Sequence, residues 1–230
     1  MRRRRTKRLL RVVLLLAAIP STFVLGRWAT GNRGTIQPGR IYRSAQLSAG
    51  QLAATIEHRQ IRSVLNLRGA NPDQPWYRAE RTATLGAGAS QVDIPLASDL
   101  WLSRAQARTL VDTLDSIDYP ILVHCQWGAE RTGLVAAVAE LLRPGGSVRS
   151  ARAQFSPWFL FLPVKDGRVM IGHVDLYERW LKASSRTHSP STFRAWLLST
   201  YSPPSPSREQ WPYDPYPPRV VARPPADARR

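Results

Sequence analysis

One segment with the pattern strand, loop, helix constrains the fold of this chain more than any other. Residues 120–124 form an almost wholly apolar run, which predicts a buried strand. After a glycine-containing loop, apolar residues keep helical spacing from Arg131 to Leu142, and Pro144 with two glycines ends the pattern. A buried strand that leads directly into a helix is the building unit of α/β proteins, so this segment indicates that class.

The same alternation runs through the middle of the chain, and it predicts an α/β fold. We expect a central, mostly parallel sheet of about four to five strands, flanked by helices. Capping-box spacing at Ser48 and Ser103 marks two of the helix starts. The predicted strands are 40–43, 63–67, 91–94 and 120–124, and the predicted helices are 48–58, 76–85, 103–117, 131–142, 171–181 and 190–201.

Composition narrows the class of site that the chain can build. The 230 residues are 43% hydrophobic with eight Trp, which suffices for one well-filled domain plus attachments. Cys125 is the single cysteine, so an intramolecular disulfide framework and a cysteine-based zinc site are excluded. The four histidines show no metal-ligand spacing, and we expect neither a metal nor a cofactor.

The formal charge of +17 is concentrated at the ends of the chain. Residues 1–11 carry seven positive residues and no acid, and residues 202–230 carry five against three acids. The arginines between these ends are spread along the sequence, with no recognition-helix pattern and no basic strand interleaved with aromatics. We therefore expect no nucleic-acid partner, and nothing in the sequence indicates an oligomeric state.

Both ends of the chain are predicted to lie outside the folded domain, which we place at 39–201. Residues 1–26 combine a basic start with an apolar run, as a signal-anchor or a signal peptide does. The catalytic domain is then expected to be extracytoplasmic, on the periplasmic side, and held at the membrane by this segment, or secreted after cleavage. Residues 27–38 are predicted to be a linker. Residues 202–230 contain nine prolines and are predicted to be a mobile tail, without which activity should survive.

The loop between the apolar strand and its helix carries the chemistry. In His124-Cys125-Gln126-Trp127-Gly128-Ala129-Glu130-Arg131-Thr132-Gly133, five residues separate the cysteine from the arginine. A loop of this length can curl its N–H groups toward one point, where the helix N-terminus also favours an anion. The same field stabilises a thiolate at Cys125, while Arg131 can offer two parallel N–H groups to phosphate oxygens. Thr132 can donate its hydroxyl to the sulfur, and His124 is given a supporting role.

These residues match the Cys-x5-Arg signature, and the chain resembles the cysteine-based protein tyrosine phosphatases. The resemblance is to the dual-specificity-like branch, and it covers about 39–183. Residues 42–46 (Tyr-Arg-Ser-Ala-Gln) and 66–69 (Asn-Leu-Arg-Gly) look like segments of small bacterial members and of the atypical plant and fungal group. The resemblance implies a protein tyrosine phosphatase-like fold, a phosphate-binding loop over 126–130 and a cysteinyl-phosphate intermediate, without a metal.

The family also implies a general acid, and Asp99 is the first candidate. It follows the third predicted strand and Pro95, and it lies 26 residues before Cys125. Asp93 and Asp73 are weaker candidates. Arg43, Arg68 and Arg78 could add positive potential near the site.

Three activities stay open at this stage. The leading hypothesis is a protein tyrosine or dual-specificity phosphatase acting on a phosphorylated protein. The same catalytic residues would serve a membrane-associated phosphatase that acts on phospholipid, inositol phosphate or another small phosphomonoester. A phosphate-binding pseudophosphatase module is the third reading, against which the intact Cys125, Gly128 and Arg131 speak.

Overall fold

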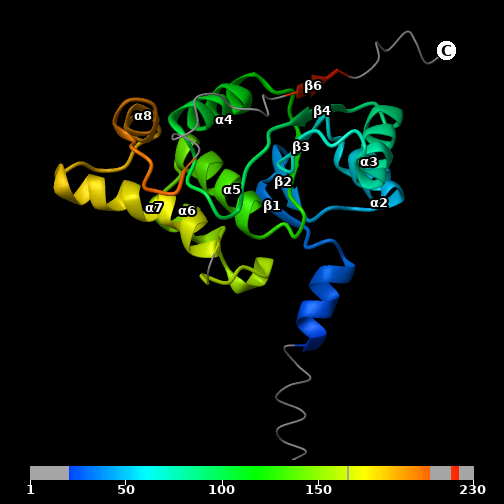
Figure 1. The fold of residues 1–230 in the computed structure, drawn as a ribbon, viewed down its shortest axis with the longest axis horizontal. Helices are drawn as coiled ribbons and strands as arrows, with labels where there is room; N and C mark the ends of the chain where they lie inside the picture. Colours follow the sequence, from blue (N-terminus) through cyan, green and yellow to red (C-terminus); the bar gives the residue numbers. More distant parts are fainter. Residues whose placement is uncertain (1–20, 165, 208–218, 223–230) are drawn as a thin grey trace, which may run out of the picture.

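A six-stranded sheet forms the centre of the protein in this computed structural model, which describes residues 21–164, 166–207 and 219–222 (Figure 1). The strand order is β1-β2-β5-β3-β4-β6. The four inner strands run parallel, and both edge strands are antiparallel to their neighbours. The bounds are β1 Gly34–Gln37, β2 Ile41–Ser44, β3 Ser63–Asn66, β4 Ser90–Asp93, β5 Ile121–His124 and β6 Arg219–Val221.

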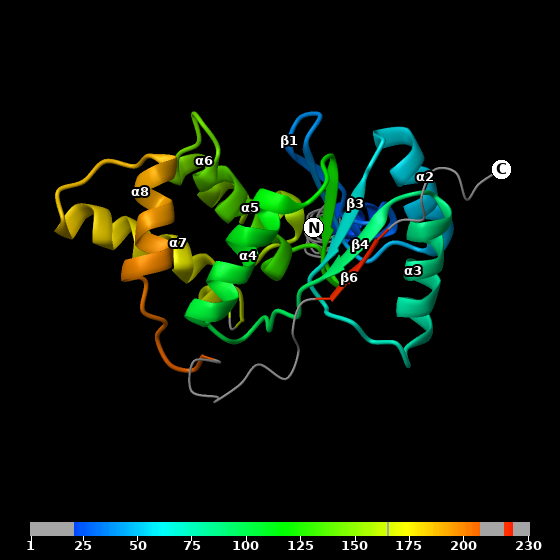
Figure 2. The ribbon, with the colours of Figure 1, turned by 90° about the horizontal axis from the view of Figure 1, so that it is seen from above.

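Helices cover both faces of this sheet, as a parallel sheet requires (Figure 2). One face carries α2 (Ala49–Arg59) and α3 (Pro75–Gly86), and the other carries α4 (Arg104–Ser116) and α5 (Glu130–Leu142). The remaining helical elements lie on the α5 side: α6 (Val148–Ala153), η1 (Pro157–Phe159), α7 (Asp166–Ala183), α8 (Pro190–Ala195) and η2 (Trp196–Thr200). The predicted fold class is confirmed, with the two edge strands added to the four that the sequence predicted.

Alternation along the inner strands divides the core between the two faces. Leu122 belongs to the smaller apolar cluster under α2 and α3, whereas Ile121 and Val123 belong to the larger cluster under α4 and α5. Val64 and Leu65 divide in the same way on β3. The apolar runs that predicted buried strands are therefore runs that pack on both sides.

Two predicted helix starts are confirmed by their hydrogen bonds. Ser48 and Ser103 each accept a hydrogen bond from the backbone amide three residues on, and the glutamine there reaches back to complete the capping box. The sequence analysis did not predict α6, which begins with a capping box at Ser147.

The predicted linker over 27–38 is wrong in part, because β1 lies inside it. This strand pairs with β2, whose outer edge would otherwise be open. Asn32, also in this stretch, is 1% exposed, and its side-chain amide donates to the carbonyls of Trp127 and Phe159. Residues 21–29, which overlap the predicted signal segment, are helical.

The tail predicted to be mobile also contributes to the fold. Its only stretch of consecutive β-branched residues, at Val220 and Val221, lies in β6, which pairs with β4. Ser207 is buried and forms a bridge with Trp101, so the first part of the tail is fixed as well.

The predicted N-terminal signal segment lies mostly outside the described residues, since 1–20 are not among them. Among the helices of the described part, none is long and apolar enough to cross a membrane. The predicted membrane anchor and the extracytoplasmic location therefore stay predictions from the sequence.

Candidate active site

The loop that the sequence predicts to be catalytic, residues 125–131 and called the catalytic loop below, begins where β5 ends, in the middle of the sheet. His124 is in register with Ser44 of β2 on one side and with Asn66 of β3 on the other. The carboxyl ends of these parallel strands therefore meet at one edge, where ligand sites of open α/β sheets form. The loop passes into α5, whose N-cap residue Ala129 makes no side-chain capping bond. This helix start is left open to an anion.

Cys125 is the first residue of this loop and is only 1% exposed. The backbone amide of Gly128 lies 3.3 Å from its Sγ atom and donates to it. Burial alone would raise the pKa of the thiol, but the charge of Arg131, the hydroxyl and amide of Thr132 and the amide of Gly128 outweigh it. The net pKa of Cys125 is lowered, so the predicted thiolate is stabilised by the residues that the signature contains.

Backbone amides of the loop are available to a ligand. Among the backbone hydrogen bonds of the described residues, none uses the amide of Gln126, Trp127, Ala129 or Glu130 as a donor. Gly128 makes the curl possible, because its φ of +69° is the left-handed conformation that favours glycine. A Cβ at this position would lie 2.6 Å from the backbone nitrogen of Ala45. The loop therefore packs directly on the segment that follows β2.

Arg131 stands at the start of α5 and reaches across the ends of two strands. Its Nη1 lies 3.5 Å from the carbonyl oxygen of Leu67 and 3.3 Å from that of Leu96. Its Nε is buried and has no hydrogen-bond partner within the described part of the chain. The guanidinium is thus held at the site with donor capacity to spare, as a phosphate-binding arginine requires.

Arg43 supports the loop from behind, and it does not face the substrate side. This fully buried side chain donates to the carbonyl of Gly128 at 2.8 Å and to Gln154 through both its backbone and side-chain oxygens. Its guanidinium carbon lies 3.8 Å from the centre of the Phe159 ring. Burial lowers the pKa of Arg43. The nearby Cys125 acts in the opposite direction, but burial is the larger effect.

His124 pairs with a residue that the sequence analysis missed. Its Nε2 lies 3.3 Å from Oε1 of Glu80 on α3, and both side chains are buried. Burial alone would lower the pKa of His124, but the negative charge of Glu80 at this distance, together with Cys125, raises it. Burial would likewise raise the pKa of Glu80, and His124, Gln46 and Arg68 lower it. The pair is therefore favoured in its ionised form.

A signal for Glu80 exists in the sequence. Tyr77, Glu80 and Thr84 share the buried face of α3, so an acid lies on the inner side of an amphipathic helix. Burial of a carboxylate is costly without a partner. Such an acid therefore points to a cationic partner elsewhere in the chain.

Gln46 and Arg68 extend this polar network toward the mouth of the site. Gln46 donates to Glu80 and accepts from Arg68, whose Nη1 lies 3.0 Å from Gln46 Oε1. Burial lowers the pKa of Arg68, the positive charge of Arg131 lowers it further, and Glu80 and Cys125 act in the opposite direction. Arg68 therefore adds positive potential at the site, whereas Arg78 is exposed and bonds to the carbonyl of Pro72.

Asp99 is exposed and lies on the loop between β4 and α4. This loop is fixed on both sides of Asp99. The carbonyl of Leu96 faces Arg131, and the amide of Trp101 donates to the carbonyl of Pro206 at 3.1 Å. The backbone amide of Leu102 donates to Nε2 of His173, while its carbonyl accepts from the Tyr201 hydroxyl. Asp99 is thus carried on a loop that contacts Arg131 directly, through the carbonyl of Leu96.

The two weaker candidates for the acid occupy different environments. Asp93 is fully buried and accepts hydrogen bonds from Tyr77, Asn66 and Gln91. Burial raises its pKa, against these hydrogen bonds, which lower it. Asp73 is exposed on the loop between β3 and α3. Asp93 therefore serves the packing of β4 against α3 rather than a role at the surface.

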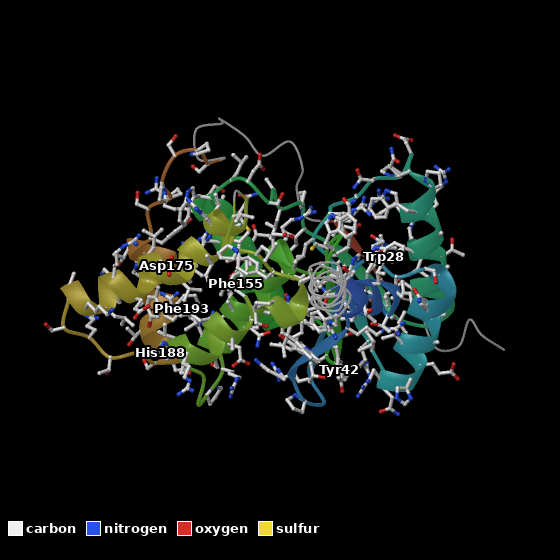
Figure 3. All side chains as sticks on the ribbon, turned by 90° about the horizontal axis from the view of Figure 1, so that it is seen from below. Trp28, Tyr42, Phe155, Asp175, His188 and Phe193 are labelled. Carbon is white, nitrogen blue, oxygen red and sulfur yellow. The ribbon has the colours of Figure 1, made fainter. Side chains whose placement is uncertain are left out.

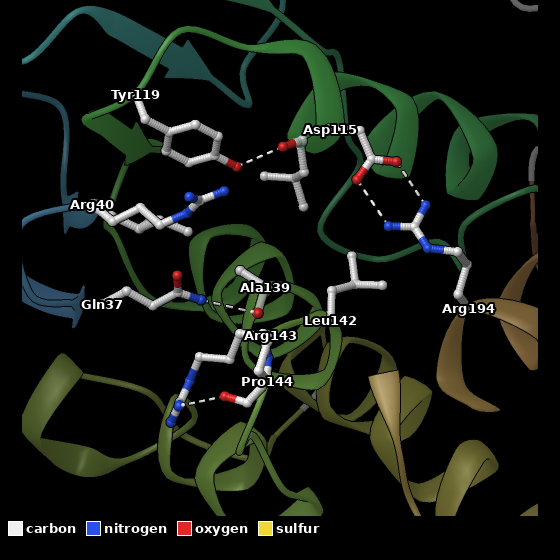
Figure 4. A pocket seen from close by; sticks show the side chains of 11 residues that line it. Gln37, Arg40, Asp115, Tyr119, Ala139, Leu142, Arg143, Pro144 and Arg194 are labelled. Carbon is white, nitrogen blue, oxygen red and sulfur yellow. Dashed lines mark hydrogen bonds and ion pairs between the residues drawn. The ribbon is translucent and has the colours of Figure 1, made fainter. Parts of the chain in front are cut away.

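A cavity of about 260 Å³ lies at the opposite end of the sheet and is separate from this site (Figure 4). Its walls include Arg40, Tyr119 and Arg194, near the amino ends of β2 and β5. Arg194 is held by both carboxylate oxygens of Asp115, and the guanidinium of Arg40 covers the Tyr119 ring. Cys125, Arg131 and Asp99 do not contribute to this cavity.

A metal-binding site in a protein requires several His, Cys, Asp or Glu side chains close together. No group of three or more His, Cys, Asp or Glu side chains within them could hold a metal ion.

Comparison with known proteins places the chain in a family. A sequence profile described as "Tyrosine phosphatase family" matches residues 25–143, which is just over half of the chain and includes the whole catalytic loop. The chain belongs to the tyrosine phosphatase family. The predicted resemblance is therefore confirmed, and the protein is assigned as a phosphatase. A search of curated proteins found no match for this phosphatase.

One solved structure agrees with the fold. The phosphatase is similar to TpbA from P. aeruginosa, with 21% identity and a TM-score of 0.50 over 67% of this chain and 92% of that one. A further match is the core catalytic domain of the PP-IP phosphatase Siw14 from S. cerevisiae, solved with citrate, at 19% identity and a TM-score of 0.47. That match covers 67% of this chain and 93% of the other. At 21% identity, the similarity to TpbA supports only the fold of this phosphatase.

Proposed function

We propose that the protein hydrolyses phosphomonoesters through a cysteinyl-phosphate formed on Cys125. The observation that carries this proposal is a buried sulfur with a lowered pKa, which accepts a hydrogen bond from the Gly128 amide in a loop whose other amides are available and whose Arg131 acts on the sulfur. A phosphate seated on this loop would have its phosphorus close to the sulfur and its oxygens toward the amides.

The reaction needs two displacements at phosphorus. The thiolate attacks, so that a sulfur–phosphorus bond forms while the bond to the leaving oxygen breaks, and Asp99 gives that oxygen a proton. Water then attacks the cysteinyl-phosphate and loses its proton to the Asp99 carboxylate. The sulfur–phosphorus bond breaks, inorganic phosphate leaves, and the thiolate is regenerated. Thr132 beside the sulfur stabilises the departing thiolate, and Arg131 neutralises charge on the phosphoryl oxygens.

Aryl phosphates of the phosphotyrosine type are the substrate class that we favour. Trp127 lies in the loop itself and is 52% exposed, so its indole offers an aromatic surface at the mouth of the site. We expect kcat/KM for a phosphotyrosine peptide to exceed that for a phosphoserine peptide, an inositol phosphate or a dispersed lipid phosphate. A higher value for the lipid or inositol compound would move the assignment to the second reading.

The mechanism is tested by hydrolysis of a small aryl phosphate with excess chelator present. We expect Cys125→Ser to abolish turnover and Asp99→Asn to lower kcat by roughly a hundredfold. Asp73→Asn is the matched control, since Asp73 is also exposed on a loop and should leave kcat unchanged. Turnover by Cys125→Ser would overturn the covalent route. A wild type that binds vanadate without turnover would be the pseudophosphatase.

We propose further that the catalytic domain works outside the cytoplasm. Seven positive residues within 1–11 are followed by an apolar run, and such charges stay on the cytoplasmic side. External protease added to spheroplasts should digest the domain. Digestion only after lysis would overturn this location.

A further inference from the structure

Exposed apolar side chains are gathered around one face of the phosphatase. Nine large apolar residues in the described part of the chain are at least 36% exposed, and eight of them lie on three segments. These eight, which we call the apolar patch, are Phe23, Val24, Leu25, Trp28, Trp127, Trp158, Leu162 and Val164. The ninth, Val220, lies on β6. A concentration of exposed apolar side chains on one part of a protein surface marks an interaction site.

Contacts between side chains and backbone join the three segments. The rings of Phe23 and Trp158 lie 5.6 Å apart, and the guanidinium of Arg27 covers the Trp158 ring. Asn32 then links the other two segments, because its side-chain amide donates to the carbonyls of both Trp127 and Phe159. The helix over 21–29 therefore contacts η1, and buried Asn32 holds η1 and the catalytic loop to each other.

The apolar patch includes an exposed residue of the catalytic loop, Trp127. In Figure 1 the helix over 21–29 projects from the lower end of the ribbon, and Figure 3 looks onto that end, with Trp28 labelled beside it. Trp127 belongs to both the patch and the catalytic loop. Whatever covers the patch therefore faces the mouth of the site.

Charge and sequence identify the occupant. The described segments 21–34 and 156–164 contain two arginines, Arg27 and Arg33, and no acid, and the third segment, 125–131, adds Glu130 and Arg131. The sequence that leads into them is a basic stretch followed by the apolar run 12–19. Tryptophan beside arginine, next to a basic and apolar segment, is the composition that binds the interface of an anionic bilayer.

We propose that the apolar patch docks the catalytic domain on an anionic lipid bilayer, with the catalytic loop at the level of the headgroups. This contact between the folded domain and the bilayer is separate from any anchoring by residues 1–20. It would give the site access to phosphate groups held close to the membrane and restrict its access to bulky soluble substrates. The proposal does not depend on turnover, and its test measures contact with lipid alone.

The test uses the full chain on vesicles of phosphatidylglycerol and phosphatidylcholine, the latter carrying brominated acyl chains that quench nearby tryptophan. We expect Trp158→Phe to remove a large part of the quenchable fluorescence. Trp180→Phe, on α7 outside the patch, should remove none. Equal quenching in the two variants would overturn the proposal, even if residues 1–20 hold the chain on the vesicle.

A second pair of variants measures affinity on unbrominated vesicles. Leu162→Ser with Val164→Ser should weaken sedimentation with vesicles by about tenfold, because two apolar side chains no longer insert. Val220→Ser is the matched control, since Val220 is as exposed but lies elsewhere. Loss of a dimer in the Leu162 and Val164 variant, without a change in vesicle binding, would assign the patch to a second copy and overturn bilayer docking.

Discussion

Glu80 places a carboxylate oxygen 3.3 Å from Nε2 of His124, and His124 is the residue directly before Cys125. The pair is buried under the catalytic loop, where an imidazolium could not persist without the carboxylate. Because the interaction between two charges is mutual, a positive His124 that is stabilised by Cys125 also favours the thiolate. We therefore expect Glu80 to act on the sulfur through His124, as a positioning residue.

Glu80→Gln should move the pH dependence of the reaction. Without the carboxylate, the pKa of His124 falls, its positive charge is lost near neutral pH, and the pKa of Cys125 rises. The thiolate is the active form, so the acidic limb of kcat/KM for an aryl phosphate should move to higher pH by roughly one unit. The rate on the alkaline plateau should change little.

Glu57→Gln on the exposed side of α2 serves as the control for this profile. A purely structural role for Glu80 would lower kcat/KM equally at all pH values and leave the limb in place. That outcome would contradict the electrostatic coupling between Glu80 and Cys125.

Gly128→Ala should damage both stability and catalysis. The positive φ alone costs about 1 kcal/mol for a residue with a side chain, and the clash with the backbone of Ser44 and Ala45 adds roughly 1–3 kcal/mol. Relief of the clash requires the loop to move, so we expect kcat to fall by about a hundredfold. Urea unfolding and aryl phosphate kinetics measure the two effects.

Gly39→Ala separates strain from collision. Gly39 has a φ of +71°, close to that of Gly128, but a Cβ there meets nothing within 4 Å. Gly39→Ala should lower the free energy of unfolding only by the cost of the positive φ, about 1 kcal/mol. The kcat of this variant should stay at the wild-type value. Equal effects of the two substitutions would mean that close packing on the segment after β2 does not hold the loop.

How much of this site could be predicted from sequence depends on how local each signal is. Cys125, Gly128 and Arg131 lie within one short loop between an apolar strand and a helix. Their spacing along the sequence is therefore enough to predict that they lie close together. Asn32 and Glu80 reach the same loop from distant parts of the chain, and no spacing rule connects them to it. The edge strands β1 and β6 are equally hard to predict. Each has only three or four residues, and each forms because β2 or β4 offers an open edge.

Arg43→Met should loosen the catalytic loop from behind. The substitution keeps the apolar volume but removes the hydrogen bonds to the carbonyl of Gly128 and to Gln154, leaving buried oxygens without a donor. We expect the free energy of unfolding to fall by about 3 kcal/mol and kcat to fall with it. Arg78→Met, at an exposed arginine, is the control for loss of a positive charge. An unchanged kcat in Arg43→Met would show that Gly128 keeps its conformation without this support.

Two truncations of the tail should show which part of it supports the fold and the activity. A chain that ends after Ala222 keeps β6 and the bridge between Trp101 and Ser207, so its activity should equal that of the full chain. A chain that ends after Tyr201 loses both, and with them the acceptor for the Trp101 amide on the loop that carries Asp99. We expect it to lose about 2 kcal/mol of stability.

The second truncation should also lose the contribution of Asp99 to turnover. With the loop released, Asp99→Asn should cost less in kcat in the chain ending at Tyr201 than in the full chain, a coupling that a double-mutant cycle measures. The expectation from sequence was that activity survives removal of residues 202–230, whereas the contacts of Pro206 and Ser207 favour a partial loss. An undiminished kcat in the shorter chain, with the full effect of Asp99→Asn, would show that Leu96 and His173 hold this loop without the tail.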